Sequence, residues 1–149
     1  MTCSTFSQGT FVPDENRIIL CANTLTKEND FEDGLKRQLI MMYDYHKYEN
    51  MDCNNCKHLA CSEIRAAMFS TACNPKGRTY KASKIFNSDT LDRGDAADFC
   101  VKDLATSHLA EKDKCTENAK RTVDYMFDKC KKDTSPFAMG SRRQTKNIA

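Results

Sequence analysis

The stretch GLKRQLIMMYDYHK, residues 34–47, carries the pattern that decides the fold. Its apolar residues recur at the spacing of an α-helix, at i, i+4, i+7 and i+8. One face of this helix consists of Leu35, Leu39, Met42 and Tyr43. A second face consists of Arg37, Met41, Asp44 and Tyr48. The periodicity predicts a long helix over residues 31–49.

Three further helices and one strand follow from periodicity and turn residues. The helices are expected over residues 55–70, 95–111 and 116–131, and the β-branched run RIILCAN, residues 17–23, predicts a short strand. The inward residues of the second helix are Leu59, Cys61, Ile64, Ala67 and Met68. The core stripe of the last helix is Ala119, Val123, Met126, Phe127 and Cys130. The sequence therefore predicts an α+β fold that is mostly α.

The length of 149 residues suffices for one domain with a core and is too short for two comfortable ones. We expect an irregular N-terminal arm over residues 1–16, a single domain over residues 17–137 and a C-terminal tail over residues 138–149. The net charge of +2 gives no indication of a nucleic-acid partner. No apolar run approaches the roughly 20 residues of a membrane span, so no transmembrane helix is predicted.

Nine cysteines are spread along the whole chain. Such spreading favours disulfides and an oxidising compartment. An odd number leaves at least one thiol without a partner in the chain, and Cys3, in the polar N-terminal segment, is the first candidate. The alternative is a zinc knuckle built from Cys53, Cys56, His58 and Cys61. No second CxxC follows this group, so the spacing favours disulfides.

The middle of the first helix, RQLIMMYD at residues 37–44, has the shape of the HExxH helix of zinc proteases. In that motif two histidines at i and i+4 bind the metal, and the Glu beside the first holds the attacking water. The third ligand often comes from a neighbouring helix. Here ACSEIRAAMFS, residues 60–70, supplies Glu63 at a suitable distance along the chain.

Four stretches resemble the mitochondrial intermembrane-space metalloproteases that mature a membrane subunit of ATP synthase and help to assemble that enzyme. RIILCAN resembles the family's strand, and RQLIMMYD resembles its HELIHAFD helix. NCKHLACSEIRAAMFSTAC, residues 55–73, resembles its NCxHxACSEIRAxxLSGxC segment. CVKDLATS and NAKRTVDYMFDKCKKDTSPF, residues 100–107 and 118–137, resemble its C-terminal part. The resemblance implies a zincin-like helical domain stapled by disulfides.

Three residues of the first helix depart from the family pattern. Arg37 stands where the family has its first zinc-binding His, Gln38 where it has the catalytic Glu, and Met41 where it has the second His. Arginine stays protonated and cannot bind zinc, glutamine cannot act as a base, and a thioether is a poor zinc ligand. The resemblance therefore implies no metal, no cofactor and no catalytic residue.

Other positions keep the family pattern. Leu39, Ile40 and Asp44 match it in the first helix, and Glu63 is kept as the possible third ligand. An ion pair is the expected replacement for the metal, with Arg37 reaching Glu63 or Asp44. The alternative is that Arg37 points into solvent. The expected members of three or four disulfides all lie in family-like segments and are Cys21, Cys56, Cys61, Cys73, Cys100 and Cys130.

These observations together predict a pseudo-protease, which is not an enzyme. We expect it in the mitochondrial intermembrane space, peripheral to the inner membrane, as an accessory subunit of ATP synthase or of a respiratory-chain complex. Its partners would be the protein subunits of that complex. The alternatives are a non-proteolytic assembly chaperone for ATP synthase membrane subunits and an active zinc protease.

Overall fold

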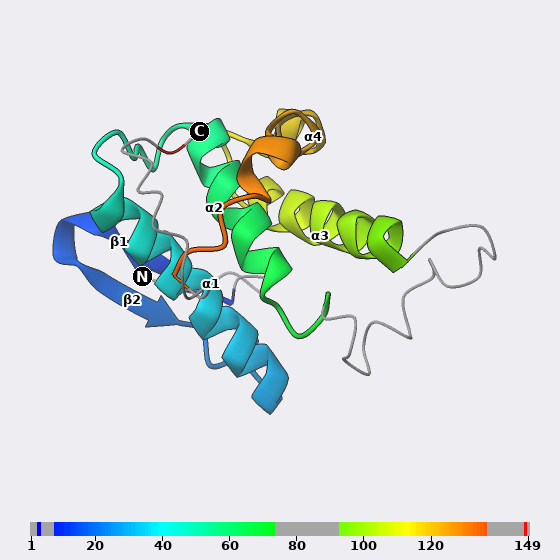
Figure 1. The fold of residues 1–149 in the computed structure, drawn as a ribbon. Coiled ribbons are helices and arrows are strands. Elements are labelled where there is room, and N and C mark those ends of the chain that lie inside the picture. Colours follow the sequence, from blue (N-terminus) through cyan, green and yellow to red (C-terminus); the bar gives the residue numbers. More distant parts are fainter. Residues whose placement is uncertain (1–2, 4–7, 74–92, 137–147, 149) are drawn as a thin grey trace.

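The computed structural model describes residues 3, 8–73, 93–136 and 148 (Figure 1). In these ranges the chain forms two short strands, four α-helices and two short 3₁₀ helices. In chain order they are β1 (Gly9–Val12), η1 (Pro13–Glu15), β2 (Arg17–Leu20), α1 (Glu28–Lys47), α2 (Cys56–Met68), α3 (Arg93–Ala110), η4 (Thr116–Asn118) and α4 (Ala119–Cys130). The prediction of an α+β fold that is mostly α is confirmed.

The four predicted helices are present, with ends that differ by a few residues. Helix α1 begins at Glu28, before the predicted start at residue 31, and its first turn carries the acidic Glu28 and Asp30. Its last turn carries His46 and Lys47. The carboxylates of the first turn and the ammonium group of Lys47 interact favourably with the helix dipole. The predicted start of the last helix at residue 116 is a 3₁₀ turn, and the α-helix proper begins at Ala119.

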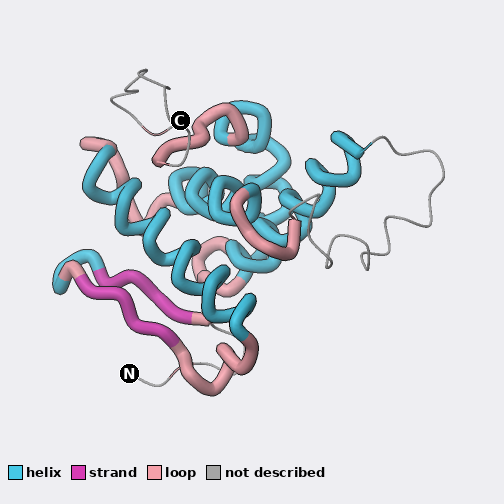
Figure 2. The backbone as a smooth tube through the Cα atoms, turned by 60° about the horizontal axis from the view of Figure 1, so that its bottom comes forward, coloured by secondary structure: helices cyan, strands magenta, loops and turns pink. Residues whose placement is uncertain are grey.

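The expectation of an irregular arm over residues 1–16 is wrong, because Gly9–Val12 form a strand. This strand pairs antiparallel with β2, with Gly9 opposite Leu20 and Val12 opposite Arg17. The turn between them ends at Asn16, which has a φ of 47° in the left-handed region. Figure 2 shows the two strands along one side of α1, against which β1 packs. The sequence does not reveal β1, because this strand is short and ends directly before Pro13.

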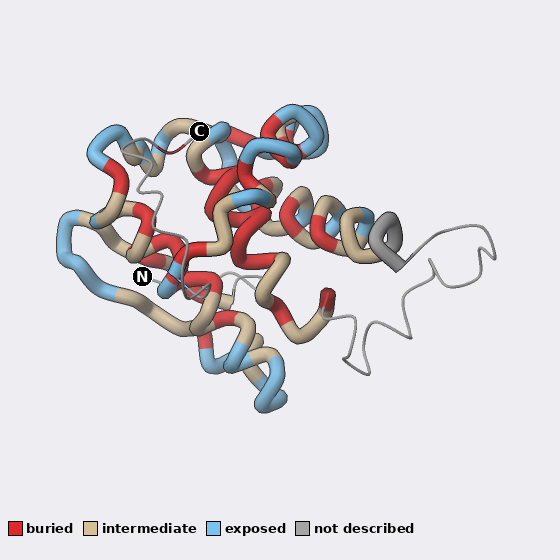
Figure 3. The backbone as a smooth tube through the Cα atoms, viewed as in Figure 1, coloured by how far each residue is buried: buried red, intermediate tan, exposed pale blue. Residues whose placement is uncertain are grey.

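Helix α2 lies at the centre of the fold, and α1, α3 and α4 all pack against it. Every residue from Leu59 to Ala67 is buried, as the red tube of Figure 3 shows. Alanines 60, 66 and 67 keep the surface of α2 small, so the neighbouring helices approach closely. The predicted core stripe of α4 is buried along its whole length. This buried part of α2 must also bury the polar side chains that it carries, Ser62, Glu63 and Arg65.

Helix α1 buries the face that carries Arg37, Met41 and Asp44, and not its apolar face. Leu39, on its apolar face, is 46% exposed, and Phe31 near the start of the helix is 49% exposed. The buried residues include Arg37, Met41 and Asp44. The apolar periodicity therefore located the helix but did not identify its buried face.

Gly34 allows the N-terminal segment to lie close to α1. A Cβ at this position would lie 3.1 Å from Cδ2 of Leu25 and 3.4 Å from Cβ of Gln8. Glycine costs about 1 kcal/mol relative to alanine inside a helix, and here the close approach of two other segments explains it.

Four disulfides connect eight of the nine cysteines. The pairs are Cys3–Cys21, Cys56–Cys115, Cys61–Cys130 and Cys73–Cys100. All six cysteines expected in bridges lie in them. The expectation that Cys3 is free is wrong, and the free thiol is that of Cys53. The zinc-knuckle alternative is excluded because the sulfurs of Cys56 and Cys61 are bonded to other cysteines.

The predicted tail over residues 138–149 lies outside the described residues except for Ile148. The side chain of Ile148 is buried, and its backbone N–H donates to Oδ1 of Asn50 at 3.0 Å. The division into arm, domain and tail stays a prediction. In the described ranges no helix has the length and apolar content needed to cross a bilayer.

The bridges predict how the chain responds to thiol reagents and to cysteine substitution. We expect one reactive thiol per chain in the denatured, unreduced protein. Replacing Cys61 and Cys130 together by alanine should lower the free energy of unfolding by about 2–5 kcal/mol. Denaturant titration measures this loss, with Cys53→Ser as the control that leaves every bridge intact. A titre of several free thiols would contradict the pairing.

Candidate functional site

The first polar contact between α1 and α2 is a buried ion pair. Arg37 on α1 donates from Nε to Oε2 and from Nη2 to Oε1 of Glu63 on α2, both at 2.8 Å. The two side chains are 3% and 1% exposed. Two parallel charge-assisted hydrogen bonds are the strongest arrangement of such a pair. The expected pairing of Arg37 with Glu63 is therefore present, and the alternative of an Arg37 in solvent is wrong.

The C-terminal end of α3 completes the surroundings of this pair. Arg37 also donates from Nη1 to Oε2 of Glu111 at 3.2 Å and from Nη2 to the carbonyl oxygen of His108 at 3.3 Å. Nδ1 of His108 lies 3.4 Å from Oε2 of Glu63. Burial alone would raise the pKa of Glu63, but the charge of Arg37 and the contact with His108 hold that pKa well below its usual range.

Sequence reasoning missed His108 and Glu111. Both lie more than 40 residues after Glu63 along the chain, and neither belongs to a recognisable motif. Only the packing of α3 against α2 brings them to Arg37. No local signal in the sequence could have found them.

A second buried ion pair joins the same two helices with the charges exchanged. Asp44 on α1 accepts a hydrogen bond from Arg65 on α2 and another from Oγ of Ser62 at 2.5 Å. Asp44 and Arg65 are 0% and 1% exposed. Burial raises the pKa of Asp44, and Arg65 and Ser62 act against that shift. Asp44, an expected alternative partner of Arg37, is thus bound by a different arginine.

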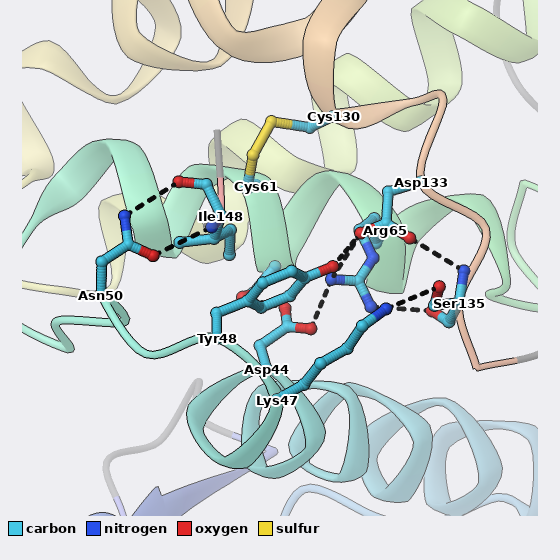
Figure 4. A network of polar contacts seen from close by, with 11 residues as sticks. Asp44, Lys47, Tyr48, Asn50, Cys61, Arg65, Cys130, Asp133, Ser135 and Ile148 are labelled. Atoms are coloured by element: carbon cyan, nitrogen blue, oxygen red, sulfur yellow. Dashed lines mark hydrogen bonds and ion pairs between the residues drawn. A yellow bond between two sulfur atoms is a disulfide. The ribbon is translucent and has the colours of Figure 1, made fainter. Parts of the chain in front are cut away.

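Arg65 extends this second pair to the segment after α4 (Figure 4). It donates from Nη2 to the carbonyl oxygen of Ser135 at 2.7 Å, and its Nη1 lies 3.8 Å from Oδ2 of Asp133. The hydroxyl of Tyr48 donates to Asp133, and Nζ of Lys47 donates to Oγ of Ser135 at 3.0 Å. Burial opposes ionisation of Asp133, but the hydrogen bond from Tyr48 and the charge of Arg65 lower its pKa.

Gln38 holds the sheet against α1. Its Nε2 donates to the carbonyl oxygen of Gly9 on β1 at 3.1 Å, and the side chain is 4% exposed. A carboxylate at this position could not donate that hydrogen bond. The glutamine amide therefore has a structural partner that a catalytic Glu would lack.

A small cavity of about 130 Å³ lies beside Arg37, Gln38, Met41 and Glu63. The free Cys53 and Lys112 also line it. Burial and the neighbouring Asp52 raise the pKa of the Cys53 thiol, so at neutral pH this group is less ionised than an ordinary cysteine. Met41 lies in the apolar core cluster.

The zinc ion that an intact HExxH motif binds can be tested against these side chains. Both carboxylate oxygens of Glu63 accept hydrogen bonds from Arg37, whose cationic guanidinium lies beside them. The described residues include no group of three or more His, Cys, Asp or Glu side chains placed to hold a metal. Arg37, Gln38, Met41 and Glu63 therefore do not fit a zinc ion.

Breaking the buried pair by removing one partner should be strongly destabilising. In Arg37→Ala the carboxylate of Glu63 stays buried without its main counter-charge, and we expect a loss of about 3–5 kcal/mol in the free energy of unfolding. The double variant Arg37→Met/Glu63→Leu should recover most of this loss because it buries no charge. Lys120→Ala, at an exposed pair with Asp124, serves as the control and should cost at most about 1 kcal/mol. Equal losses for Arg37→Ala and the control would contradict the buried pair.

The lowered pKa of Glu63 also predicts how stability depends on pH. The unfolded chain binds a proton at Glu63 near the ordinary pKa, and the folded chain does so only at lower pH. The stabilisation from Glu63 is therefore complete above that ordinary pKa and is lost as the pH falls through the lowered folded value. Asp44 contributes with the opposite sign because its folded pKa is raised.

The measurement is the free energy of unfolding from about pH 6 to about pH 3, around the ordinary carboxyl pKa values. We expect Glu63→Gln to show a smaller loss on acidification than the wild-type chain. Glu32→Gln, at an exposed pair with Lys36, should follow the wild-type curve. Parallel curves for the wild-type chain and Glu63→Gln would show that Glu63 titrates as an ordinary carboxyl group.

Comparisons with known proteins place these residues in a family. A model of the Peptidase M76 family matches residues 1–138. The chain is 35% identical to the mitochondrial inner membrane protease ATP23 of Candida albicans over 137 residues, which are 91% of this chain and 54% of that protein. It is 36% identical over 140 residues to the Kluyveromyces lactis protein of that name, covering 91% and 53%. The Schizosaccharomyces pombe protein is 34% identical over 137 residues, covering 91% and 70%.

The chain spans about half the length of the Candida and Kluyveromyces relatives. No solved structure matches the chain.

The comparisons correct one expectation and identify the family. The expectation that the chain is not an enzyme is contradicted, because the matching family is a peptidase family and the relatives are named as proteases. These names point to a peptidase. The correspondence of Arg37, Gln38 and Met41 with ligand and base positions stays a prediction. With a family model matched over most of its length, the chain belongs to the Peptidase M76 family.

Proposed function

We propose that this chain acts at the mitochondrial inner membrane, on its intermembrane-space side, as an assembly member of its family that binds protein subunits of a membrane complex. Two findings support the proposal. The relatives are named mitochondrial inner membrane proteases, and four disulfides suit an oxidising compartment. The complex would be ATP synthase or a respiratory-chain complex.

The observation that carries the binding role is the pair of buried contacts Arg37–Glu63 and Asp44–Arg65. Both pairs link α1 to α2, and the charged groups also bond to neighbouring chain segments. A buried ion pair contributes little net stability compared with apolar packing. It does restrict the relative positions of the two helices, because a shift of either helix would leave a buried charge without its partner. The pairs therefore fix one relative position of α1 and α2, which suits a rigid surface for a protein partner.

The binding role has two forms that differ in abundance. As an accessory subunit, the chain would remain in the finished complex in a fixed ratio to the other subunits. As an assembly chaperone, it would be bound only to intermediates and would leave before the complex is complete. We favour the accessory subunit, because buried, mutually satisfied charges suit a permanent structural part.

Peptide-bond hydrolysis is a second candidate, and the names of the relatives favour it. The cavity beside Arg37, Gln38 and Met41 is where a substrate group would be sought first. No step is assigned to these residues, because they do not fit the zinc ion that the motif would require.

The test is to express the tagged full chain in cells that lack the native one and to separate mildly solubilised mitochondrial complexes on native gels. We expect the chain to migrate with a mature inner-membrane complex in a constant ratio to its subunits. The double variant Arg37→Met/Glu63→Leu, which loses the first ion pair, should lower the incorporated fraction several-fold. Lys120→Ala is the control and should incorporate normally.

Other outcomes decide against the accessory subunit. Recovery only on incomplete complexes would make the chain an assembly chaperone. A chain that migrates alone, and that in purified form cleaves precursors of inner-membrane proteins, would be a peptidase. Protease treatment of mitochondria with a ruptured outer membrane tests the compartment, because an intermembrane-space chain becomes accessible only after the rupture.

A further inference from the structure

A second hollow lies away from the buried ion pairs, between the beginning of α2 and the beginning of α4. Its volume is about 710 Å³, far larger than that of the cavity beside Arg37. The two helices pack side by side in the upper part of Figure 1. The hollow is open to solvent, and nothing in the ion pairs or the cavity described above uses it.

The charged side chains that line this hollow are all basic. Its charged lining residues are Lys57, Lys114 and Arg121, and in the described part of the chain none of them pairs with a carboxylate. Lys114 donates from Nζ to Oδ1 of Asn54 at 3.0 Å, which leaves its charge uncompensated. Other lysines on and near α4 differ, since Lys120 and Lys131 each contact an aspartate. Uncompensated cations around a concavity attract an anion.

The backbone adds to this charge and keeps the hollow in shape. The lining includes residues of the first turns of α2 and α4, whose N-terminal ends carry partial positive charge. The disulfide Cys56–Cys115 joins the first residue of α2 to the segment before η4. One wall of the hollow is thus bonded covalently to the other, and an anion would meet a site that is already formed.

The rim of the hollow carries an exposed aromatic ring. Tyr125 is 62% exposed, and Nζ of Lys57 and Nζ of Lys129 lie 5.1 Å and 5.5 Å from the centre of its ring. An exposed tyrosine flanked by lysines is typical of a surface at the level of lipid headgroups, where the ring meets the apolar boundary and the ammonium groups meet phosphate. An acidic peptide would explain the cations but not the exposed ring at the rim.

We propose that this hollow binds the phosphate of an anionic phospholipid headgroup and so attaches the chain to a membrane surface. Lys57, Lys114 and Arg121 would bind the phosphate oxygens, and Tyr125 would lie at the boundary of the acyl chains. This site goes beyond the proposed assembly function and is independent of it. A chain that failed to enter any complex would still bind such a membrane.

The test is sedimentation of the purified full chain with vesicles of phosphatidylcholine alone or with about a fifth of phosphatidylglycerol. We expect binding only to the anionic vesicles. Replacing Lys57, Lys114 and Arg121 together by glutamate should weaken this binding about a hundredfold or more, since the loss of each basic residue near an anionic surface weakens binding about fivefold and the new carboxylates are repelled. Tyr125→Ala should weaken it several-fold without changing the net charge.

The matched control reverses Arg17, Lys27 and Lys132, three exposed cations outside the hollow, and changes the net charge by the same amount. It should retain most of the binding. Equal loss in both triple variants would overturn the site in favour of diffuse attraction. Binding of inorganic phosphate without vesicle binding would overturn the lipid, and tight binding of a polyglutamate peptide without vesicle binding would point to an acidic protein. Circular dichroism checks that each variant is folded.

Discussion

The fold depends on two charges of opposite sign in the buried part of one helix, Leu59–Ala67 of α2. Helix α2 carries Glu63 and Arg65 two positions apart, and neither can reach water. Each therefore needs an ionic partner from another segment, and α1 supplies both, as Arg37 and Asp44. Further hydrogen bonds come from the end of α3 and from the segment after α4, while Nε of Arg65 has no partner. The positions of α1, of the end of α3 and of the segment after α4 are thus tied to these two charges.

Much of the secondary structure could be predicted from the sequence, because it depends on local patterns. The spacing of Val123, Met126 and Phe127 defined α4 and its buried stripe, which the structure confirms. The strand β1 was not predicted because only two apolar residues, Phe11 and Val12, lie between Gly9 and Pro13, and they carry too little periodicity. The buried face of α1 was not predicted either, for a different reason. The charges of α2 need Arg37 and Asp44 on the inner face of α1, and this requirement is invisible in the sequence of α1 alone. Leu39 is left exposed as a result.

The candidate site was predictable only in part. The helical register of Arg37 and the position of Glu63 predicted the ion pair, and the structure shows it with two parallel hydrogen bonds. Arg65 was not predicted as the partner of Asp44. The sequence marked Arg65 only as part of a stretch that resembles the family. His108 and Glu111 depended on how α3 packs, which no spacing in the chain reveals. The comparisons with named proteases then corrected the class of the protein, which the residue types had suggested was not an enzyme.

The three longest bridges all contain a cysteine of α2 or of the turn after it, namely Cys56, Cys61 and Cys73. This connectivity determines how mechanical force would travel through the molecule. If the two ends of the chain were pulled apart, the shortest covalent path would follow the first turns of α2 from Cys56 to Cys61 and cross directly to Cys130. Helix α3 and most of α4 lie outside that path and would bear no load. Helix α1 lies on that path between Cys21 and Cys56, so the pull would act on Arg37 and Asp44, while Glu63 and Arg65, beyond Cys61, would stay outside the path.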